Sequence, residues 1–422
     1  MKKTVSSLLL ILAFTGLGAQ QRQDPAAVAA LKENIHRAGN NTHVYEFGPL
    51  SDTPAPEGYK PFYISHYGRH GARTAWGGKD YAAVISTLEA ARDEGLLTPA
   101  GDSLLAEVRL VAEAHGGMDG RLTQRGIREH ALLAERMYGR YPEVFRDGNR
   151  QVRSISSTAP RCLLSMIGFT TRLNELQPDL DFYWDTGERF MEYLTNGAPP
   201  QVGRGARKIL SEYGAYVPDT VFVMERLFTD PVRARAHIPG SIVSFERKIF
   251  EAARVSDGCD IPGNLFRHLP FDAVYYFWET GNLDSYLNHG NSAEFGEARM
   301  ETTHKVVADI VEKAEEVIAD GGWAADLRFG HDYPILSLAS YLGLEGVGDR
   351  WPASEVSAHW WTFRHVPFAA NLQMVFYRND GGDVLVKCLY NEQECLLRGL
   401  APVAGPYYRW EDVRTNIKGY LR

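Results

Sequence analysis

A five-residue stretch, Arg-His-Gly-Ala-Arg at positions 69–73, constrains this chain more than any other part of it. It follows an apolar, aromatic run at residues 62–64 that is typical of a β-strand. Glycines at positions 68 and 71 flank the histidine and let the backbone turn sharply and approach a ligand. Two guanidinium groups beside an imidazole favour an anion between them, and guanidinium forks match phosphate oxygens. By itself the stretch is equally typical of a surface loop, so its interpretation depends on the rest of the chain.

A second segment, residues 152–162, has the pattern of a strand followed by the beginning of a helix. Ser157 or Thr158 is expected to cap this helix, and Pro160 suits its first turn. Arg161 would then lie beside a helix N-terminus, where backbone amides also favour anions. The segment therefore predicts a second strand end that carries a cation.

A third segment, residues 327–334, shows the order strand, tight turn, helix, with Pro334 in the first helical turn. His331 and Asp332 are expected to project from the end of this strand. Two adjacent titratable groups on one turn can supply an electrostatic contact and an acid. Three strand ends thus carry the candidate chemistry, as open α/β sheets favour.

Hydrophobic periodicity predicts several other elements. His130, within one of the helices, is interpreted as structural. Gly139 is expected to end that helix, and residues 379–383 are expected to form a hairpin turn. The expected helices cover residues 26–37, 81–94, 103–115, 124–138, 301–319 and 335–342, and the hairpin strands cover residues 372–378 and 384–390.

The composition is that of a globular protein: 422 residues, 44% hydrophobic, with a formal net charge of −8. An acidic chain argues against nucleic acid as a partner. Lys2 and Lys3, an apolar run at residues 8–14 and small residues up to Ala19 predict a signal peptide cleaved near residue 19. No later stretch is long and apolar enough for a transmembrane helix. We expect an exported protein, periplasmic or extracellular, whose oligomeric state the sequence leaves open.

Four cysteines allow three full disulfide pairings. Cys388 and Cys395 flank a possible turn and form the most plausible pair, but four buried thiols are equally consistent with the sequence. No cysteine has metal-site spacing with histidine, so no metal site is predicted, and a calcium ion at the surface stays open. The other two cysteines are Cys162 and Cys259.

Taken together, these segments resemble the histidine acid phosphatase branch of the histidine phosphatase superfamily, from about residue 62 to about residue 394. Ser-Ser-x-x-x-Arg-Cys at residues 156–162 is similar to the multiple inositol polyphosphate phosphatases. Those enzymes usually carry His-Ala-Glu where this chain has His-Asp-Tyr at residues 331–333, which is closer to acid phosphatases and phytases. Thr-Ala-Trp at residues 74–76 stands where the family commonly has a proline. The resemblance is carried by residues 69–73, 122–130, 156–162, Ser165, Phe169, His331 and Asp332.

The resemblance implies an α/β fold: a mostly parallel central sheet with flanking helices, phosphoglycerate-mutase-like, plus an inserted, mainly helical cap domain. Residues 180–305 agree in character, because they are rich in aromatics and short amphipathic runs and show no clear strand series. We therefore expect a signal peptide at 1–19, a first part of the phosphatase domain at 20–179, the cap at 180–305 and a second part at 306–422.

The resemblance also implies a function, which is hydrolysis of small-molecule phosphate monoesters through a phosphohistidine, including inositol polyphosphates (phytate) or other small organic phosphates. No cofactor or metal is implied. A phosphoglycerate-mutase-like phosphotransferase and a non-catalytic phosphate-ester-binding protein are the alternatives. The implied roles are nucleophile for His70, proton donor for Asp332, and phosphate binding for Arg69, Arg73, Arg161 and His331.

Overall fold

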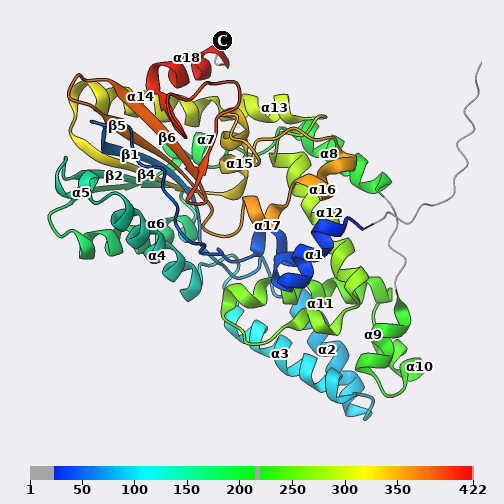
Figure 1. Cartoon of the computed structure of the whole chain (residues 1–422). Coiled ribbons are helices and arrows are strands. Elements are labelled where there is room, and N and C mark those ends of the chain that lie inside the picture. The colour runs from blue at the N-terminus through cyan, green and yellow to red at the C-terminus, as the bar shows by residue number, and fades with distance from the viewer. Residues whose placement is uncertain (1–22, 214–218, 421–422) are drawn as a thin grey trace, which may run out of the picture.

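A computed structural model describes residues 23–213 and 219–420 (Figure 1). The predicted signal peptide at residues 1–19 lies outside the described residues. Within the described ranges, no helix combines the length and the apolar character that crossing a membrane requires.

The described strands form one sheet in the order β3-β2-β4-β1-β5-β6-β7, with β8 paired to β6. Strands β3, β2, β4 and β1 run parallel, whereas β5 is antiparallel to β1 and continues into the predicted hairpin with β6. The prediction of a mostly parallel core is confirmed. The strands are β1 (Lys60–Arg69), β2 (Gln151–Ser156), β3 (Asp181–Thr186), β4 (Trp323–Gly330), β5 (Asn371–Arg378), β6 (Val384–Tyr390), β7 (Gln393–Cys395) and β8 (Tyr407–Arg409).

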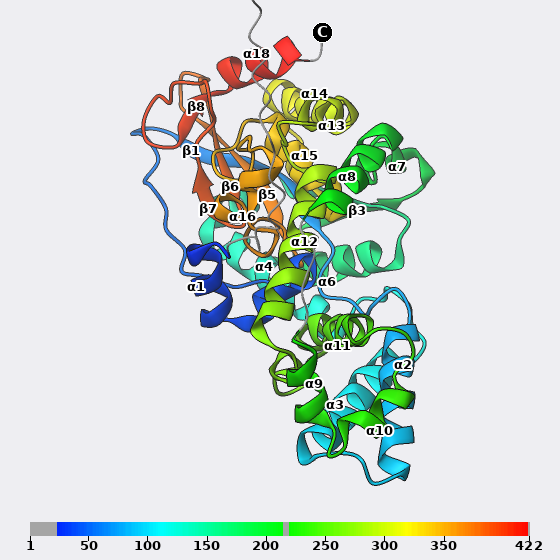
Figure 2. The ribbon, with the colours of Figure 1, turned by 90° about the vertical axis from the view of Figure 1, so that its right-hand side faces the viewer.

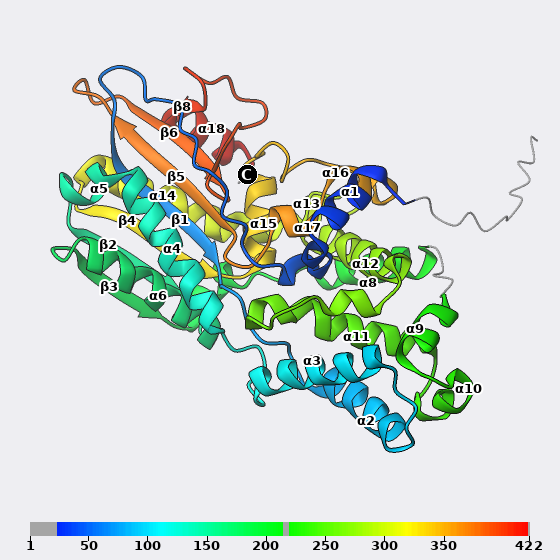
Figure 3. The ribbon, with the colours of Figure 1, turned by 60° about the horizontal axis from the view of Figure 1, so that its bottom comes forward.

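Helices cover both faces of the sheet, so the central strands are buried nearly throughout. Alternate residues of β1 enter two different cores: Tyr63 and Tyr67 pack on one face with α14 (His304–Asp320), α15 (Asp332–Tyr341) and α18 (Trp410–Tyr420), and Ile64 packs on the other. The second face is covered by α4 (Gln124–Arg140), α5 (Pro142–Arg146) and α6 (Pro160–Leu176) (Figure 3).

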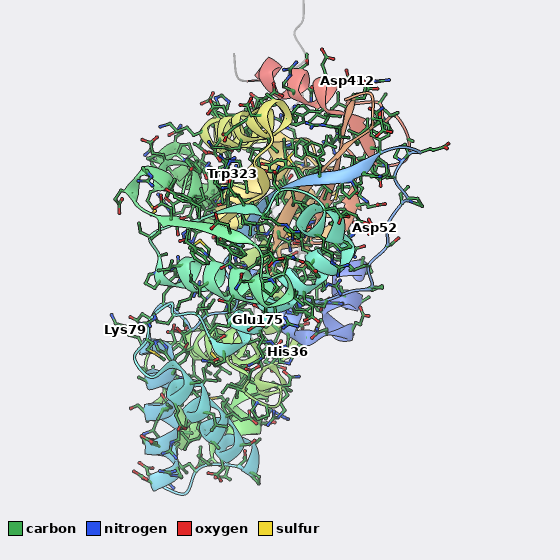
Figure 4. The ribbon with its side chains drawn as sticks, turned by 90° about the vertical axis from the view of Figure 1, so that its left-hand side faces the viewer. His36, Asp52, Lys79, Glu175, Trp323 and Asp412 are labelled. Atoms are coloured by element: carbon green, nitrogen blue, oxygen red, sulfur yellow. The ribbon has the colours of Figure 1, made fainter. Side chains whose placement is uncertain are left out.

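A separate helical body lies beyond one end of the sheet (Figure 2). Its apolar core is formed mainly by two parts of the chain that are far apart in sequence, and residues 27–38 and Phe363 add to it. One part is α2 (Lys79–Asp93) and α3 (Pro99–His115); the other includes α9 (Thr220–Leu227), α11 (Ile242–Ser256) and α12 (Phe271–His289). Figure 4 marks the two bodies with Trp323, at the beginning of β4, and Lys79, at the beginning of α2.

The remaining helices are short or lie at the edges of these bodies. They are α1 (Pro25–Glu33), α7 (Met191–Leu194), α8 (Pro200–Glu212), α10 (Pro231–Ala234), α13 (Gly296–Met300), α16 (Val356–His359) and α17 (Thr362–His365), and 3-10 helices η1 (Ile35–Thr42), η2 (Glu188–Phe190), η3 (Arg235–His237), η4 (Asp257–Cys259), η5 (Leu265–His268), η6 (Glu301–Thr303) and η7 (Ala353–Glu355).

The structure corrects three local predictions. Residues 181–186 form strand β3, although residues 180–305 were expected to show no clear strand series; β3 is a six-residue edge strand, and its short aromatic run at residues 182–184 shows no alternation of apolar and polar residues. Helix α4 continues through Gly139 and ends at Arg140, because Pro142 disfavours a helical conformation of the residue before it. The N-cap of α6 is Ala159, with no side-chain cap from Ser157 or Thr158. The domain boundaries stay a prediction.

All four cysteines are free thiols in the structure. Cys388 and Cys395 nevertheless lie directly opposite each other across β6 and β7. The predicted N-cap of α4 is present, because Thr123 Oγ1 accepts a hydrogen bond from the Gly126 amide.

Candidate active site

The loop after β1 passes unusually close to the N-terminus of α4. A Cβ atom built on Gly71 would lie 2.4 Å from the Gly126 carbonyl oxygen, and one built on Gly126 would lie 2.4 Å from the Ala72 carbonyl oxygen. Any side chain at either position would therefore force the two segments apart. The close approach that the glycine predicts is thus made to another backbone segment of the protein.

Two polar side chains on the flanking helices hold this loop. Glu129 is buried, and its two carboxylate oxygens accept hydrogen bonds from the backbone amides of Ala72 (2.7 Å) and Tyr45 (3.1 Å). Ser165 accepts from the Gly71 amide at 3.1 Å. Burial raises the pKa of Glu129 to about 7. Both residues belong to the motifs noted in the sequence, but their role as supports could not be read there.

His70 sits at the carboxyl end of β1, and its backbone bonds to Gly330 and Ala369 on both sides. Nδ1 lies 2.9 Å from the Gly71 carbonyl oxygen, which can only accept, so Nδ1 carries the hydrogen. Burial, reinforced by the neighbouring arginines, holds the pKa of His70 well below its usual range. The ring is therefore neutral, with a free lone pair on Nε2, which is the form of imidazole that acts as a nucleophile.

Arg69 is completely buried beside His70. Its Nη1 donates to the carbonyl oxygens of Asn41 (2.6 Å) and Val366 (2.7 Å), and its guanidinium lies over the Phe368 ring at 4.9 Å. Nη2 lies 3.4 Å from Asp332 Oδ2. The side chain is thus fixed in position by contacts from distant parts of the chain.

Arg73 and Arg161 both lie over the indole of Trp76, at 4.5 Å and 4.6 Å from the ring centroid. The indole attracts both cations and offsets part of their mutual repulsion. Gly120 leaves the space for it, because a Cβ there would lie 2.7 Å from the ring. Burial, followed by the charge of Arg69, lowers the pKa of Arg73 to about 9. Trp76 lies in the segment that stands where the family commonly has a proline. The sequence alone did not suggest its contact with the two arginines.

The Nε donors of Arg69, Arg73 and Arg161 share one property. All three are buried, and none has a hydrogen-bond partner among the described residues. Buried donors in proteins are nearly always paired, and three such donors around one histidine are an arrangement that an anion would complete.

His331, at the end of β4, is joined to Arg161. Its Nδ1 accepts from Arg161 Nη2 at 3.1 Å, so Nε2 carries the hydrogen and donates to Ser157 Oγ at 3.1 Å. Burial, followed by the charge of Arg161, lowers the pKa of His331 to about 3. The hydrogen bond from Arg161 therefore fixes the tautomer of His331, and Ser157 accepts from that ring in place of capping α6.

Asp332 follows at the beginning of α15. Burial raises its pKa, but the charge of Arg69, together with His289 and a 2.8 Å hydrogen bond from Asn41 Nδ2, lowers it more, so the pKa lies below its usual range. The carboxyl is ionised at neutral pH in this arrangement. Asn41 and His289 belong to no recognisable motif, so the sequence contained no signal for either.

The structure brings all six predicted site residues together. Arg69 contacts Asp332, Arg161 contacts His331, Arg73 shares the indole with Arg161, and the rings of His70 and His331 lie 5.7 Å apart at a steep angle. They come from the carboxyl ends of β1 and β4 and from the beginning of α6. Across the described part of the chain, no group of three or more histidine, cysteine or acidic residues is arranged to hold a metal ion.

A cleft of about 380 Å³ opens beside this cluster, between the strand ends and the helical body. Arg73 and Trp76 lie on the sheet side, and η1, α2, α11 and α12 contribute the remaining wall.

The sheet order, the helices on both faces and the helical body define the fold of the histidine acid phosphatases, as the resemblance predicted. The solved structure of the Bifidobacterium longum multiple inositol polyphosphate phosphatase in complex with phosphate matches with a TM-score of 0.75 and 17% identity, over 92% of this chain and 98% of that chain. The same enzyme in complex with inositol hexasulfate matches with a TM-score of 0.69 and 17% identity, over 90% and 97%.

A phytase from D. castellii matches with a TM-score of 0.63 and 15% identity, over 92% of this chain and 86% of that chain. No family model matches the sequence, and neither does any curated protein. At these identities the solved structures establish the fold.

Proposed function

We propose that this protein is a phosphoric monoester hydrolase that works through a phosphohistidine at His70. The observation that carries the proposal is the set of three buried, unpartnered guanidinium Nε donors around a neutral imidazole. A transferring phosphoryl group spreads its charge over three equatorial oxygens, and fixed cationic donors stabilise that charge.

In the first step, His70 Nε2 attacks phosphorus and the ester P–O bond breaks. Asp332, in its protonated form, gives its proton to the leaving alkoxide. Water then attacks phosphorus, the P–N bond breaks, and the Asp332 carboxylate takes the proton from the water. Arg69, Arg73, Arg161 and His331 line the phosphoryl site in both steps.

The ionised state of Asp332 is compatible with this role. A bound phosphate brings negative charge close to the carboxyl, which raises its pKa and favours the protonated form at acidic pH. The substrates we propose are phosphate esters of small alcohols, either inositol polyphosphates or other small organic phosphates. The basic and apolar N-terminal segment supports export, to the periplasm or the exterior.

The direct test is to measure phosphate release from p-nitrophenyl phosphate, sugar phosphates and inositol phosphates at acidic pH. Release of free phosphate is the expected result. An isomerised ester without free phosphate would indicate a phosphotransferase, and binding without turnover on every ester would indicate a binding protein; either result would overturn the proposal.

Arg161→Ala and Arg73→Ala are expected to lower kcat/KM by similar amounts, about 10²- to 10³-fold, which is the effect of removing one fixed donor from a developing anion. Arg172, further along α6, is the control, because its ion pairs are with Glu135 and Glu175 at the surface. Steady-state kinetics on one ester would compare the three variants. If Arg161→Ala matched Arg172→Ala, Arg161 would have no place in the phosphoryl site.

A further inference from the structure

Acidic side chains form part of the wall of the cleft beside the proposed phosphoryl site. Three carboxylates from three different helices face it: Asp80 of α2, Glu251 of α11 and Asp284 of α12. Because the three carboxylates belong to separate helices, the tertiary fold brings them together at one surface.

The cations that line the cleft do not balance these carboxylates. Arg73 belongs to the proposed phosphoryl site. Arg254 is already used internally, because it donates to Asn41 Oδ1 (3.0 Å) and the Gly39 carbonyl (3.2 Å) and pairs with Glu251 (3.4 Å). Its guanidinium therefore supports the wall of the cleft and is not a free site for an anion.

Asp80 and Asp284 form no ion pair with a lysine or arginine of the described residues. Asp284 accepts a hydrogen bond from Asn288, one turn further along α12, and Asp80 lies in the first turn of α2. The charge of Arg207 acts on Asp284 from outside the cleft lining, whereas no cation of the described cleft wall forms an ion pair with either carboxylate.

Asn40 adds a further acceptor of a different kind. Only 4% of this residue is exposed, and its Nδ2 donates to the Trp278 carbonyl at 2.9 Å, which fixes the orientation of the amide. Its Oδ1 has no hydrogen-bond partner among the described residues. Its backbone has a φ of 54°, which residues other than glycine rarely adopt. A buried, unpartnered acceptor held at a strained backbone is typical of a ligand contact.

We propose that the cleft selects esters whose alcohol part is a neutral polyol without a second phosphate, such as a sugar or cyclitol monophosphate. This inference rests on the proposed function. Additional phosphates would meet repulsion from the carboxylates of this wall. Hydroxyl groups donate, and they match the oxygens of Asn40, Asp80 and Asp284.

Two substrates that differ only in phosphate number give the sharpest test. We expect the kcat/KM of the wild-type protein on myo-inositol 1-phosphate to be at least about tenfold higher than its kcat/KM on inositol hexakisphosphate. A tenfold difference corresponds to a modest binding preference. p-Nitrophenyl phosphate is measured in parallel. Activity on p-nitrophenyl phosphate with a preference for the hexakisphosphate would overturn this inference alone, whereas inactivity on all three esters would overturn the proposed function.

A matched pair of double variants tests the carboxylates themselves. Asp80→Asn with Asp284→Asn is expected to raise kcat/KM on the hexakisphosphate by about tenfold, because two like charges leave the wall. The control, Asp93→Asn with Asp272→Asn, removes the same number of charges from the same two helices at positions that do not line the cleft. It is expected to change kcat/KM on the hexakisphosphate less than about twofold. Equal effects of the two pairs would contradict the proposal. Since the wild-type comparison needs no variant, the inference stays testable even if a variant fails to fold.

Discussion

His70→Ala is expected to lower kcat by at least about 10⁴-fold, comparable with losses seen when the nucleophile of other covalent hydrolases is removed. The reason is that His70 is the residue whose neutral ring and free Nε2 lie among the three arginines. Circular dichroism would check that the variant folds. His268→Ala is the control: His268 is a buried histidine of the helical body that pairs with Glu107, so its loss is expected to lower stability and leave kcat unchanged.

The same prediction has a covalent readout. A rapid alkaline, denaturing quench during turnover is expected to trap a phosphoryl group on His70 of the wild-type protein, and peptide mapping would locate it. The quench must avoid acid, because acid hydrolyses the P–N bond of phosphohistidine. A phosphoryl group on any other residue, or activity of His70→Ala within tenfold of wild type, would refute the nucleophile assignment.

Asp332→Asn is expected to separate two kinds of ester. Alkyl alkoxides need a proton to leave, whereas nitrophenolate leaves readily without one, so the loss of kcat is expected to be about 10²- to 10⁴-fold on an alkyl phosphate and much smaller on p-nitrophenyl phosphate. The substitution keeps the shape of the side chain and removes its titrating proton. Equal losses on the two esters would mean that Asp332 acts in binding or structure.

The pH dependence follows from the contacts of Asp332. Arg69, His289 and Asn41 hold its pKa below the usual range, so the protonated donor form is lost as pH rises. Activity of the wild-type protein on alkyl esters is therefore expected to fall from acidic towards neutral pH. In Asp332→Asn this decline is expected to disappear, and kcat measured across pH on both esters would show it. A wild-type optimum above neutral pH would be the contrary result.

Local chemistry explains why much of the fold could be predicted. Pro160 and Pro334 mark first helical turns, and strongly periodic apolar runs mark helices such as α3 and α14. These signals act within a few residues, and the sequence displays them directly. The edge strand β3 was not predicted because it has only six residues and shows no alternation of apolar and polar residues.

The contacts that complete the candidate site act over much longer separations. Asn41 reaches Asp332 across 291 positions in sequence, and Ser157 reaches His331 across 174. Trp76 could be recognised as a departure from the family pattern, but its place beneath Arg161 depends on how α6 is set against the first loop. Such pairings arise from the tertiary fold, so a single sequence gives no local sign of them.

The shared core of the helical body has a consequence for synthesis of the chain. Helices α2 and α3 leave the ribosome long before α11 and α12, which complete their apolar core. Until then the nascent chain contains a pair of helices whose apolar face is uncovered, and exposed surface of this kind promotes aggregation. The apolar face of α2 and α3 therefore stays uncovered from the synthesis of residue 115 until α12 is complete at residue 289, and in this period the chain is expected to need a chaperone.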